Sequence, residues 1–389
     1  MRIGLLTREW PPENYGGAGV HVEYLTRELR KLIDVDVQCW GAPRPDATAH
    51  QVPDTLADAN PSLQSMGIDL AQVAALSDVE LVHSHTWYAN FAGQVGSVYL
   101  DVPHVISAHS LEPRRPWKAE QLGGGYRLSS WIERTSYETA DRIIAVSHGM
   151  RADVLDCYPN VDPDLVEVVH NGIDTQLYQP SADTDLIESV GIDPTRPYVL
   201  FVGRITRQKG IAHLLKAAER MPADIPLVLI ASSPDTAELG AEVEAGVARL
   251  IDYKGADNML WVNEHLSRAH LVQALTHAGV FACPSVYEPL GIVNLEAMAC
   301  ETAVVASDVG GIPEVVVEGE TGTLVHYDES DPEAFEKDLA DGLSAVMSDP
   351  AKATAMGVAG RTRAVDEFGW DKIARITVDV YQRAIDARG

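Results

Sequence analysis

The sequence predicts an α/β protein in which two doubly wound parallel sheets form two domains. Short apolar runs typical of buried strands alternate with amphipathic segments typical of helices, and this alternation occurs twice along the chain. Between the two series, over 175–197, apolar residues become sparse and three prolines appear, as in a linker. With 389 residues the chain can build two cores. We therefore expect one domain over 1–180, a second over 181–369, and a last helix over about 370–389 that rejoins the first.

The composition is that of a soluble globular protein, with 46% hydrophobic and 22% charged residues. The formal net charge of −27 repels phosphate backbones and anionic lipids, so we expect no nucleic-acid or membrane partner. No apolar run is long enough to cross a bilayer, and Met1 begins directly with an apolar strand, which together favour a cytoplasmic protein. The four cysteines lack the spacing of a disulfide framework or a metal site.

The first strand, over 2–7, leads through a glycine-rich turn at 15–19 into an amphipathic helix. A strand, a glycine turn and a helix in this order bring backbone N–H groups against a phosphate, so Gly16 and Gly17 are candidate binding residues. A tight bend without a ligand is the alternative. The full glycine fingerprint of a dinucleotide-binding domain is absent, and no acidic residue closes the second strand over 35–40, which disfavours a dehydrogenase.

Histidines follow the next two strands, over 80–83 and 104–108, at the edge where open parallel sheets bind ligands. His109 comes directly after a strand and is a candidate functional residue, whereas His85 is expected to line the site or to be structural. No carboxylate accompanies these histidines at ligand spacing, so we expect no metal. The remaining strands of the first series are expected over 142–146 and 166–169.

The second series begins with a strand over 198–202, followed by a basic loop and a helix over 211–220. The loop carries Arg204 and Lys209, five positions apart, so both can reach one diphosphate. Arginine would contribute a fork of N–H donors and lysine a mobile charge. A solvated basic loop is the alternative, but in so acidic a chain a basic cluster at the carboxyl end of a strand is informative. Further strands are expected over 227–231 and 259–262.

The stretch over 280–306 predicts a βαβ unit, with a helix over 292–300 between two apolar strands. Glu288 lies in the first loop and Glu296 in the helix, so two carboxylates and the free N–H groups of a helix N-terminus belong to one junction. Carboxylates suit sugar and ribose hydroxyls, and a helix N-terminus suits phosphate, so this junction predicts a sugar-nucleotide site. Closing helices are expected over 332–347, 350–368 and 370–385.

Four patterns carry a resemblance to a known family: Arg204-x4-Lys209, Glu288-x7-Glu296, Gly16-Gly17 and His109. Together they resemble the retaining glycosyltransferases of family 4, which use nucleotide-sugar donors. The stretches PPENYGGAGVHVEYLTREL and SAHSLEPRRPWK look most like the short bacterial glycogen synthases of the actinobacterial type, a group that includes α-maltose-1-phosphate synthases using ADP-glucose. The resemblance covers essentially the whole chain and implies the GT-B fold, in which two Rossmann-like domains face a central cleft.

The resemblance also implies a role for each candidate residue, in a reaction that needs no metal or cofactor. Arg204 and Lys209 would grip the donor diphosphate and offset the charge of the leaving group. Glu288 would bind hydroxyls of the transferred sugar, and Glu296 would hold the ribose. His109 would contact the donor glucose near the reacting carbon. The donor would also lie along the chain at Gly16, Gly17, Leu290 and Gly291.

The acceptor is the part of the site where this sequence departs from the longer bacterial glycogen synthases. Asn14 replaces a lysine of their glycine loop and Thr86 replaces an acid, so their acceptor details need not carry over. Three cations follow His109 on one loop, and because a neutral glucan end needs no cations, they predict a phosphorylated acceptor. The alternatives are a solvated or acid-paired loop, and aromatic residues that stack on a glucan. The cations are Arg114, Arg115 and Lys118, and the aromatic residues are Trp117, Tyr126 and Trp131.

The predicted function is transfer of α-glucose from ADP-glucose or UDP-glucose to form an α-1,4 bond. The acceptor is either glucose 1-phosphate, which gives maltose 1-phosphate, or the end of a glycogen chain in glycogen biosynthesis. Two alternatives stay open: a family 4 transferase acting on another phosphorylated acceptor such as an inositol phosphate, and a nucleotide-sugar-binding protein without turnover. The sequence leaves the oligomeric state open, and a homodimer is one possible state.

Overall fold

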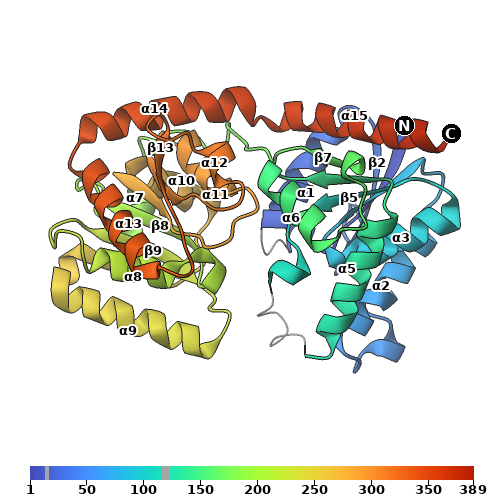
Figure 1. The fold of residues 1–389 in the computed structure, drawn as a ribbon, viewed down its shortest axis with the longest axis horizontal. Helices are drawn as coiled ribbons and strands as arrows, with labels where there is room; N and C mark the ends of the chain where they lie inside the picture. Colours follow the sequence, from blue (N-terminus) through green and yellow to red (C-terminus); the bar gives the residue numbers. More distant parts are fainter. Residues whose placement is uncertain (14–16, 116–122) are drawn as a thin grey trace. The chain divides into compact units, whose positions relative to one another are not determined.

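The computed structural model describes residues 1–13, 17–115 and 123–389. These residues divide into two compact units (Figure 1). Unit 1 comprises Met1–Gly172 and Trp370–Gly389, and unit 2 comprises Ile173–Gly369. The last helix of the chain therefore belongs to the unit that contains the first strand.

The boundary between the units lies at residue 172 rather than at the predicted residue 180. The backbone amide of Ile173 donates to the carbonyl of Phe368 at 2.8 Å, and the carbonyl of Tyr178 accepts from Arg361 at 3.3 Å. These hydrogen bonds tie 173–180 to unit 2, and local sequence patterns do not reveal them because their partners lie far along the chain.

The expected linker over 175–197 is also a packed part of unit 2. It contains a short helix, α7 (Asp185–Ser189), that contacts α10 (Arg268–His277). The side chain of Gln273 on α10 accepts hydrogen bonds from the amides of Leu186 and Ile187, at 3.0 and 3.3 Å. The low apolar density of this stretch therefore reflects polar anchoring and not a free linker.

Unit 1 is built on a seven-stranded, fully parallel sheet in the order β3-β2-β1-β4-β5-β6-β7. Its strands are mostly apolar because helices cover both faces. Pairing sets Leu5 of β1 opposite Val37 of β2 and His83 of β4. The strands are β1 (Arg2–Leu6), β2 (Asp34–Trp40), β3 (Thr48–His50), β4 (Leu81–His85), β5 (His104–Ala108), β6 (Arg142–Ala145) and β7 (Val166–Val168).

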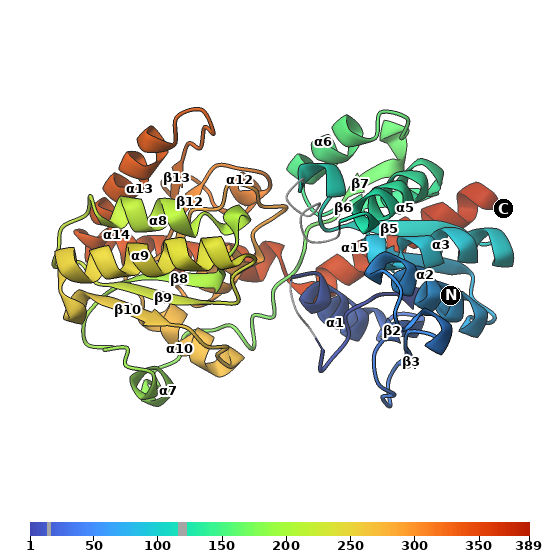
Figure 2. The ribbon, with the colours of Figure 1, turned by 90° about the horizontal axis from the view of Figure 1, so that it is seen from below.

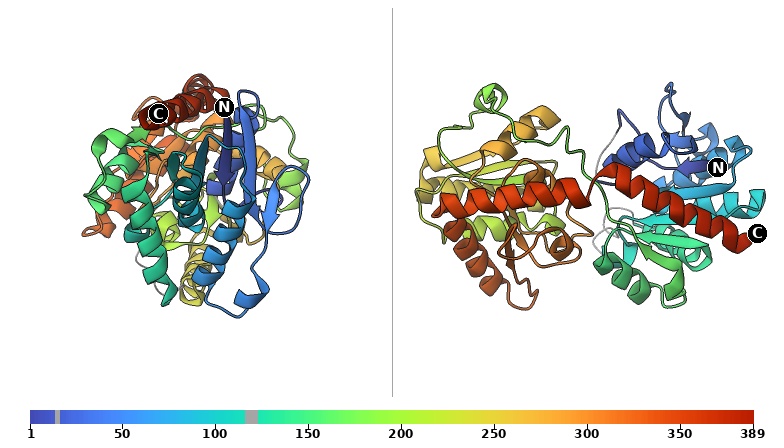
Figure 3. Two further views of the ribbon diagram at one scale, coloured as in Figure 1. Left: turned by 90° about the vertical axis from the view of Figure 1, so that its right-hand side faces the viewer. Right: turned by 90° about the horizontal axis from the view of Figure 1, so that it is seen from above.

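Two sets of helices cover the sheet of unit 1. The first and last helices, α1 and α15, pack together on one face, and α2, α3 and α5 pack together on the other (Figures 1, 2 and 3). On α15, Tyr381 is fully buried and its hydroxyl lies 2.7 Å from His83 Nδ1, which fixes this helix to β4. The helices are α1 (Gly17–Leu29), α2 (Pro61–Ala75), α3 (Trp87–Leu100), α5 (Gly125–Thr139), α6 (His148–Cys157), α15 (Trp370–Arg388) and the short η1 (Asp54–Leu56), η2 (Glu112–Arg114) and η3 (Pro163–Leu165).

Unit 2 has a six-stranded parallel sheet in the order β10-β9-β8-β11-β12-β13. Its core is a continuous cluster of buried aliphatic residues and Phe from the strands, α8, α9 and α13. The strands are β8 (Val199–Arg204), β9 (Leu227–Ser232), β10 (Met259–Val262), β11 (Val280–Cys283), β12 (Val304–Ser307) and β13 (Gly322–Val325).

The helices of unit 2 also form two sets. One set joins α8 to α9 and α13, and the other joins α11 to α10 and α14 (Figure 1). The helices not yet given are η4 (Arg207–Lys209), α8 (Ile211–Ala218), α9 (Ala237–Lys254), η5 (Ala256–Asn258), α11 (Ile292–Ala299), α12 (Ile312–Val315), α13 (Pro332–Met347) and α14 (Pro350–Glu367). Among the described residues, none of the helices is both long and apolar enough to cross a membrane.

Each sheet reverses its strand order once, between β1 and β4 in unit 1 and between β8 and β11 in unit 2. At such a switch point the loops leaving the two adjacent strands diverge to opposite faces, and the space between them is where open α/β sheets bind ligands. A residue that binds ligand is therefore expected to lie at the carboxyl ends of these strands.

Candidate functional site

The switch point of unit 2 holds the strongest ion pair among the predicted residues. Lys209 closes η4, directly after β8, and Glu288 lies in the loop after β11, the neighbouring strand. Lys209 Nζ lies 2.7 Å from Glu288 Oε2, and the hydroxyl of Ser285 donates to the same carboxylate oxygen at 3.2 Å. The Glu288 side chain is only 9% exposed and that of Lys209 is 27% exposed, so the pair is largely shielded from water.

Two glycines let the loops around this pair approach each other closely. Gly210 has φ +65°, and a Cβ there would lie 1.8 Å from the Pro284 carbonyl oxygen. Gly310 has φ +57°, and a Cβ there would lie 1.9 Å from the Glu288 carbonyl oxygen. That same oxygen accepts a hydrogen bond from the amide of Gly311 at 3.0 Å. The Glu288 loop is therefore held by backbone contacts that only glycine permits.

Arg204 and Lys209 lie near each other at the carboxyl end of β8. Burial lowers the pKa of Lys209, but the Glu288 carboxylate outweighs burial and the pKa stands above its usual value. The charge of Arg204 opposes this rise, which shows that the two cations lie within electrostatic reach of each other. The Arg204 side chain is 62% exposed at the end of β8, with Asp235 at 3.7 Å, so its guanidinium can turn toward an anion.

Glu296 lies on α11, and its surroundings bring the pKa of its carboxyl close to neutral pH. Burial raises the pKa of Glu296 to about 7, while a hydrogen bond from Tyr178 and the charges of Arg268 and Lys209 favour the ionised form. Tyr178 is a site residue that the sequence analysis did not find. Leu290 is buried, and Gly291 caps α11 with φ +99°. Leu290, Gly291 and Glu296 therefore lie in one loop and helix, and Glu296 is within electrostatic reach of Lys209.

The switch point of unit 1 contains a cluster of neutral histidines. His85 Nδ1 lies 3.0 Å from His109 Nε2, and His21 on α1 packs against both rings with its Nδ1 2.6 Å from Asn171 Oδ1. Burial lowers the pKa of His21 to about 4, and burial together with neighbouring histidines lowers the pKa values of His85 and His109 well below their usual range. At neutral pH these rings therefore act as neutral hydrogen-bonding groups.

The same cluster is the one place among the described residues where three potential metal ligands gather. Ring nitrogens of His21, His85 and His109 lie within 4.8 Å of one another. A tetrahedral zinc ion with bonds of about 2.1 Å needs its nitrogens about 3.4 Å apart. Because two of these rings bond each other, the cluster fits a hydrogen-bonded group better than a metal centre.

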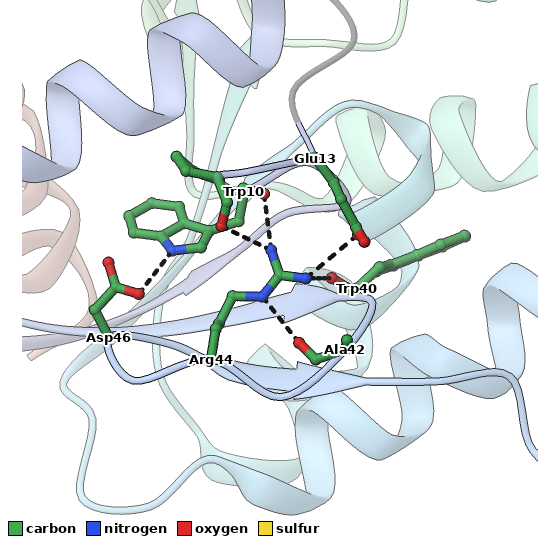
Figure 4. A network of polar contacts seen from close by, with 7 residues as sticks. Trp10, Glu13, Trp40, Ala42, Arg44 and Asp46 are labelled. Carbon is green, nitrogen blue, oxygen red and sulfur yellow. Dashed lines mark hydrogen bonds and ion pairs between the residues drawn. The ribbon is translucent and has the colours of Figure 1, made fainter.

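The loop before α1 is held by an arginine that the sequence analysis missed. The buried guanidinium of Arg44 donates to the carbonyls of Trp10 and Pro11 at 2.8 and 3.0 Å. It also pairs with the carboxylate of Glu13 at 3.3 Å (Figure 4). It also donates to the carbonyls of Trp40 and Ala42, at 3.2 and 3.0 Å. Arg44 therefore fixes the chain between β1 and the glycine turn. Gly17 begins α1, whereas Gly16 and Asn14 lie outside the described residues.

Comparison with known proteins decides the family. The profile "Glycosyl transferases group 1" matches residues 183–363, and "Glycosyltransferase Family 4" matches 15–177. Alpha-maltose-1-phosphate synthase of Mycolicibacterium smegmatis is 55% identical over 387 residues, which cover 98% of this chain and 99% of that protein. The chain is a family 4 glycosyltransferase. The predicted family and the predicted hexosyltransferase activity are confirmed.

Other relatives of this family 4 glycosyltransferase are less similar to it in sequence. D-inositol 3-phosphate glycosyltransferase of Xylanimonas cellulosilytica is 31% identical over 320 residues, which cover 79% of this chain and 73% of that protein. The solved sucrose-phosphate synthase from Thermosynechococcus elongatus has a TM-score of 0.81 at 25% identity, with 99% of both chains covered. Anabaena HepE in complex with UDP-glucose has a TM-score of 0.78 at 18% identity, covering 98% of this chain and all of that one, and shows the same fold. The predicted GT-B fold class is confirmed.

In this glycosyltransferase, the two described arginines of the predicted acceptor loop have carboxylate partners. Arg114 pairs with Asp153 at 2.9 Å and Asp156 at 2.8 Å, and Arg115 pairs with the fully buried Glu112 at 3.0 Å. The structure thus matches the acid-paired alternative for both. Lys118 and Trp117 lie outside the described residues. Of the aromatic residues proposed to stack on a glucan, Tyr126 donates to the Glu112 carbonyl at 2.8 Å, and Trp131 is partly exposed near Phe91.

Proposed function

We propose that this enzyme transfers α-glucose from a nucleotide-glucose donor, ADP-glucose or UDP-glucose, to glucose 1-phosphate. The bond between glucose C1 and the diphosphate oxygen breaks, a bond from C1 to O4 of the acceptor forms with retention, and the O4 proton leaves with the nucleoside diphosphate. The product is maltose 1-phosphate. The observation that carries the proposal is the shielded Lys209–Glu288 pair at the unit 2 switch point, in a chain 55% identical to an α-maltose-1-phosphate synthase.

The residues of unit 2 can supply the positive charge and the N–H donors that a departing diphosphate requires. Lys209 has three N–H donors, and Glu288 takes one, so two remain for phosphate oxygens. Arg204 adds a planar fork of donors, and together the cations offset the charge that develops on the leaving group. The reaction therefore needs no metal ion or other cofactor in this proposal. Glu288 would orient hydroxyls of the transferred glucose, and Glu296 would accept hydrogen bonds from the ribose.

His109 and the glycine turn are further candidates for contacts with the donor. The imidazole of His109 is neutral at neutral pH, so it can hydrogen-bond a sugar hydroxyl without adding a charge beside the reacting carbon. His85 orients this ring through their contact at 3.0 Å. Gly16 and Gly17 would let the backbone approach the diphosphate.

Two other acceptors follow from the relatives and the sequence. Glycogen would be elongated directly if the site admitted a neutral chain end. An inositol phosphate is favoured by the 31% identity to a D-inositol 3-phosphate glycosyltransferase. These two activities and the proposed one would use the same donor-binding residues, so only the acceptor distinguishes them.

An acceptor panel tests the proposal. Purified enzyme is incubated with ADP-glucose or UDP-glucose and with glucose 1-phosphate, glycogen or inositol 3-phosphate, and both nucleoside diphosphate release and the glucosylated product are measured. We expect maltose 1-phosphate with an α linkage, and no product with Lys209→Met. Product formed only on glycogen or only on inositol phosphate would replace the proposed acceptor. Donor binding without turnover would refute the proposed catalytic roles of these residues.

A further inference from the structure

A hollow in unit 1 lies at the carboxyl ends of β1, β2 and β3. Its volume is about 260 Å³, close to the lower end of the range for small-molecule sites. Arg8 follows β1, Trp40 ends β2 and His50 ends β3, while Ile68 of α2 forms an apolar part of the wall. The hollow therefore lies on the sheet edge where open α/β folds bind ligands.

Arg8 differs from the other arginines near this edge. Its guanidinium carbon lies 4.2 Å from the centre of the Tyr88 ring and 5.2 Å from that of Trp40. The two rings meet edge to face, 5.8 Å apart, and thus hold the cation between them. Within the described part of the chain, no carboxylate pairs with Arg8, whereas Arg44 and Arg114 both have carboxylate partners. In a chain of charge −27, a cation held by aromatic rings is available to an anionic ligand.

The neighbouring titratable groups do not neutralise the charge of Arg8. Glu13 also lines the hollow, but its carboxylate pairs with Arg44 at 3.3 Å (Figure 4). Burial lowers the pKa of His50, so this ring is neutral at neutral pH, and its Nε2 lies 2.7 Å from the side chain of Gln38. Arg8 is thus the one described cation in the wall that lacks a carboxylate partner.

The backbone beside Tyr88 is strained. Thr86 has φ +62° and ψ 163°, a region that is essentially restricted to glycine, and α3 begins at the next residue. Such strain is concentrated at functional sites. It lies between His85, in the histidine cluster, and Tyr88, against Arg8, so the two parts of the sheet edge are joined by a single short stretch of chain.

We propose that the hollow lined by Arg8, Trp40 and His50 binds the phosphate end of the acceptor, an inference that depends on the proposed sugar-phosphate acceptor. The guanidinium, held against the Tyr88 ring, binds the phosphate through two parallel N–H···O bonds, and the Trp40 ring contacts the sugar. Since β1 and β4 are neighbours, the sugar then extends along the sheet edge toward His85 and His109. A neutral glucan end would leave the Arg8 charge without a partner. The site therefore selects for a phosphorylated acceptor.

The test compares Arg8→Gln with Arg114→Gln in the full-length enzyme. Arg114 is the matched control, because it lies in the same unit, is one of the three cations that the sequence predicts to bind this phosphate, and pairs with Asp153 and Asp156 instead. At saturating donor, we expect Arg8→Gln to raise the KM for glucose 1-phosphate about 10- to 100-fold, since a hydrogen bond between charged groups contributes that much. Arg114→Gln should leave this KM within about twofold. Arg8→Lys, which keeps the charge but loses the fork, should lie between them.

Two further readouts separate binding from folding and from the proposed function. The donor KM and the melting temperature of Arg8→Gln should equal those of the wild type. Glucose 1-phosphate binding, measured by calorimetric titration, should weaken by the same factor as its KM rises. Wild-type enzyme that neither binds nor uses glucose 1-phosphate would overturn both the proposed function and this inference. Normal use of it by Arg8→Gln, or its loss in Arg114→Gln instead, would overturn the inference alone.

Discussion

Replacing Lys209 by methionine tests whether the pair at the unit 2 switch point is needed for stability as well as for turnover. The substitution keeps the length and apolar stem of the side chain but removes the charge, and Glu288 is then left as a carboxylate only 9% exposed. Breaking a buried ion pair by removing one partner costs about 3–5 kcal/mol. Because the Lys209 side chain is about one quarter exposed, we expect roughly 2–3 kcal/mol here.

The assay is thermal and urea unfolding without ligand. For a unit of this size, the expected loss corresponds to a fall of roughly 4–12 °C in the melting temperature of unit 2. Adding Glu288→Gln removes the stranded charge, so the double variant should recover at least half of the lost stability. Turnover should not recover, because the cation that we propose offsets the diphosphate charge is still missing.

Lys337→Met is the matched control for this prediction. Lys337 also pairs with a carboxylate, Asp341, at 2.9 Å, but its side chain is 60% exposed. Exposed ion pairs contribute about 0–1 kcal/mol, so this variant should unfold nearly as the wild type does. The reasoning is refuted if Lys209→Met is as stable as Lys337→Met, or if adding Glu288→Gln lowers its stability further.

Three other predictions concern separate parts of the structure. Burial raises the pKa of Glu296 to about 7, and in the proposed function ribose hydroxyls donate to its ionised form, so nucleoside diphosphate affinity should rise about tenfold from pH 6 to pH 8. Calorimetric titration of Glu296→Gln should show no such dependence. Gly310→Ala should destabilise unit 2 by at least about 2 kcal/mol in urea unfolding, since its Cβ would overlap the Glu288 carbonyl oxygen and its φ is positive. Tyr381→Phe should cost about 1–3 kcal/mol, because it leaves the buried His83 Nδ1 without its hydroxyl partner; an unchanged unfolding midpoint would contradict this.

The strands and the neighbourhood of Lys209 and Glu288 could be predicted from local sequence. A strand of a parallel sheet that is covered on both faces is a short apolar run, so the sequence pattern indicates β8, β11 and β12 directly. Candidate binding residues in such sheets follow the strands, and this rule selects Lys209 and Glu288, which the structure brings into contact. Both steps depend on neighbours in the chain, which a sequence displays.

The helices α2, α3 and α5 were not predicted, and for α3 the composition explains why. α3 contacts β4 and β5 and also lies against α2 and α5, it carries no charged residue, and it contains Gly93 and Gly96. A helix without a charged outer face resembles a buried apolar segment in sequence, and glycines argue locally against a helix. Packing against the neighbouring elements overrides that preference.

By itself the sequence determined the fold class, the family and the cluster of donor-binding candidates, because all three depend on local patterns and on their order. Only the tertiary structure decided which charges have partners. Arg114 meets Asp153 and Asp156 about forty positions away, while Arg8 meets the rings of Trp40 and Tyr88 instead of a carboxylate. The electrostatic effect of a side chain depends on groups within a few ångströms in space, and folding brings those groups from distant parts of the chain.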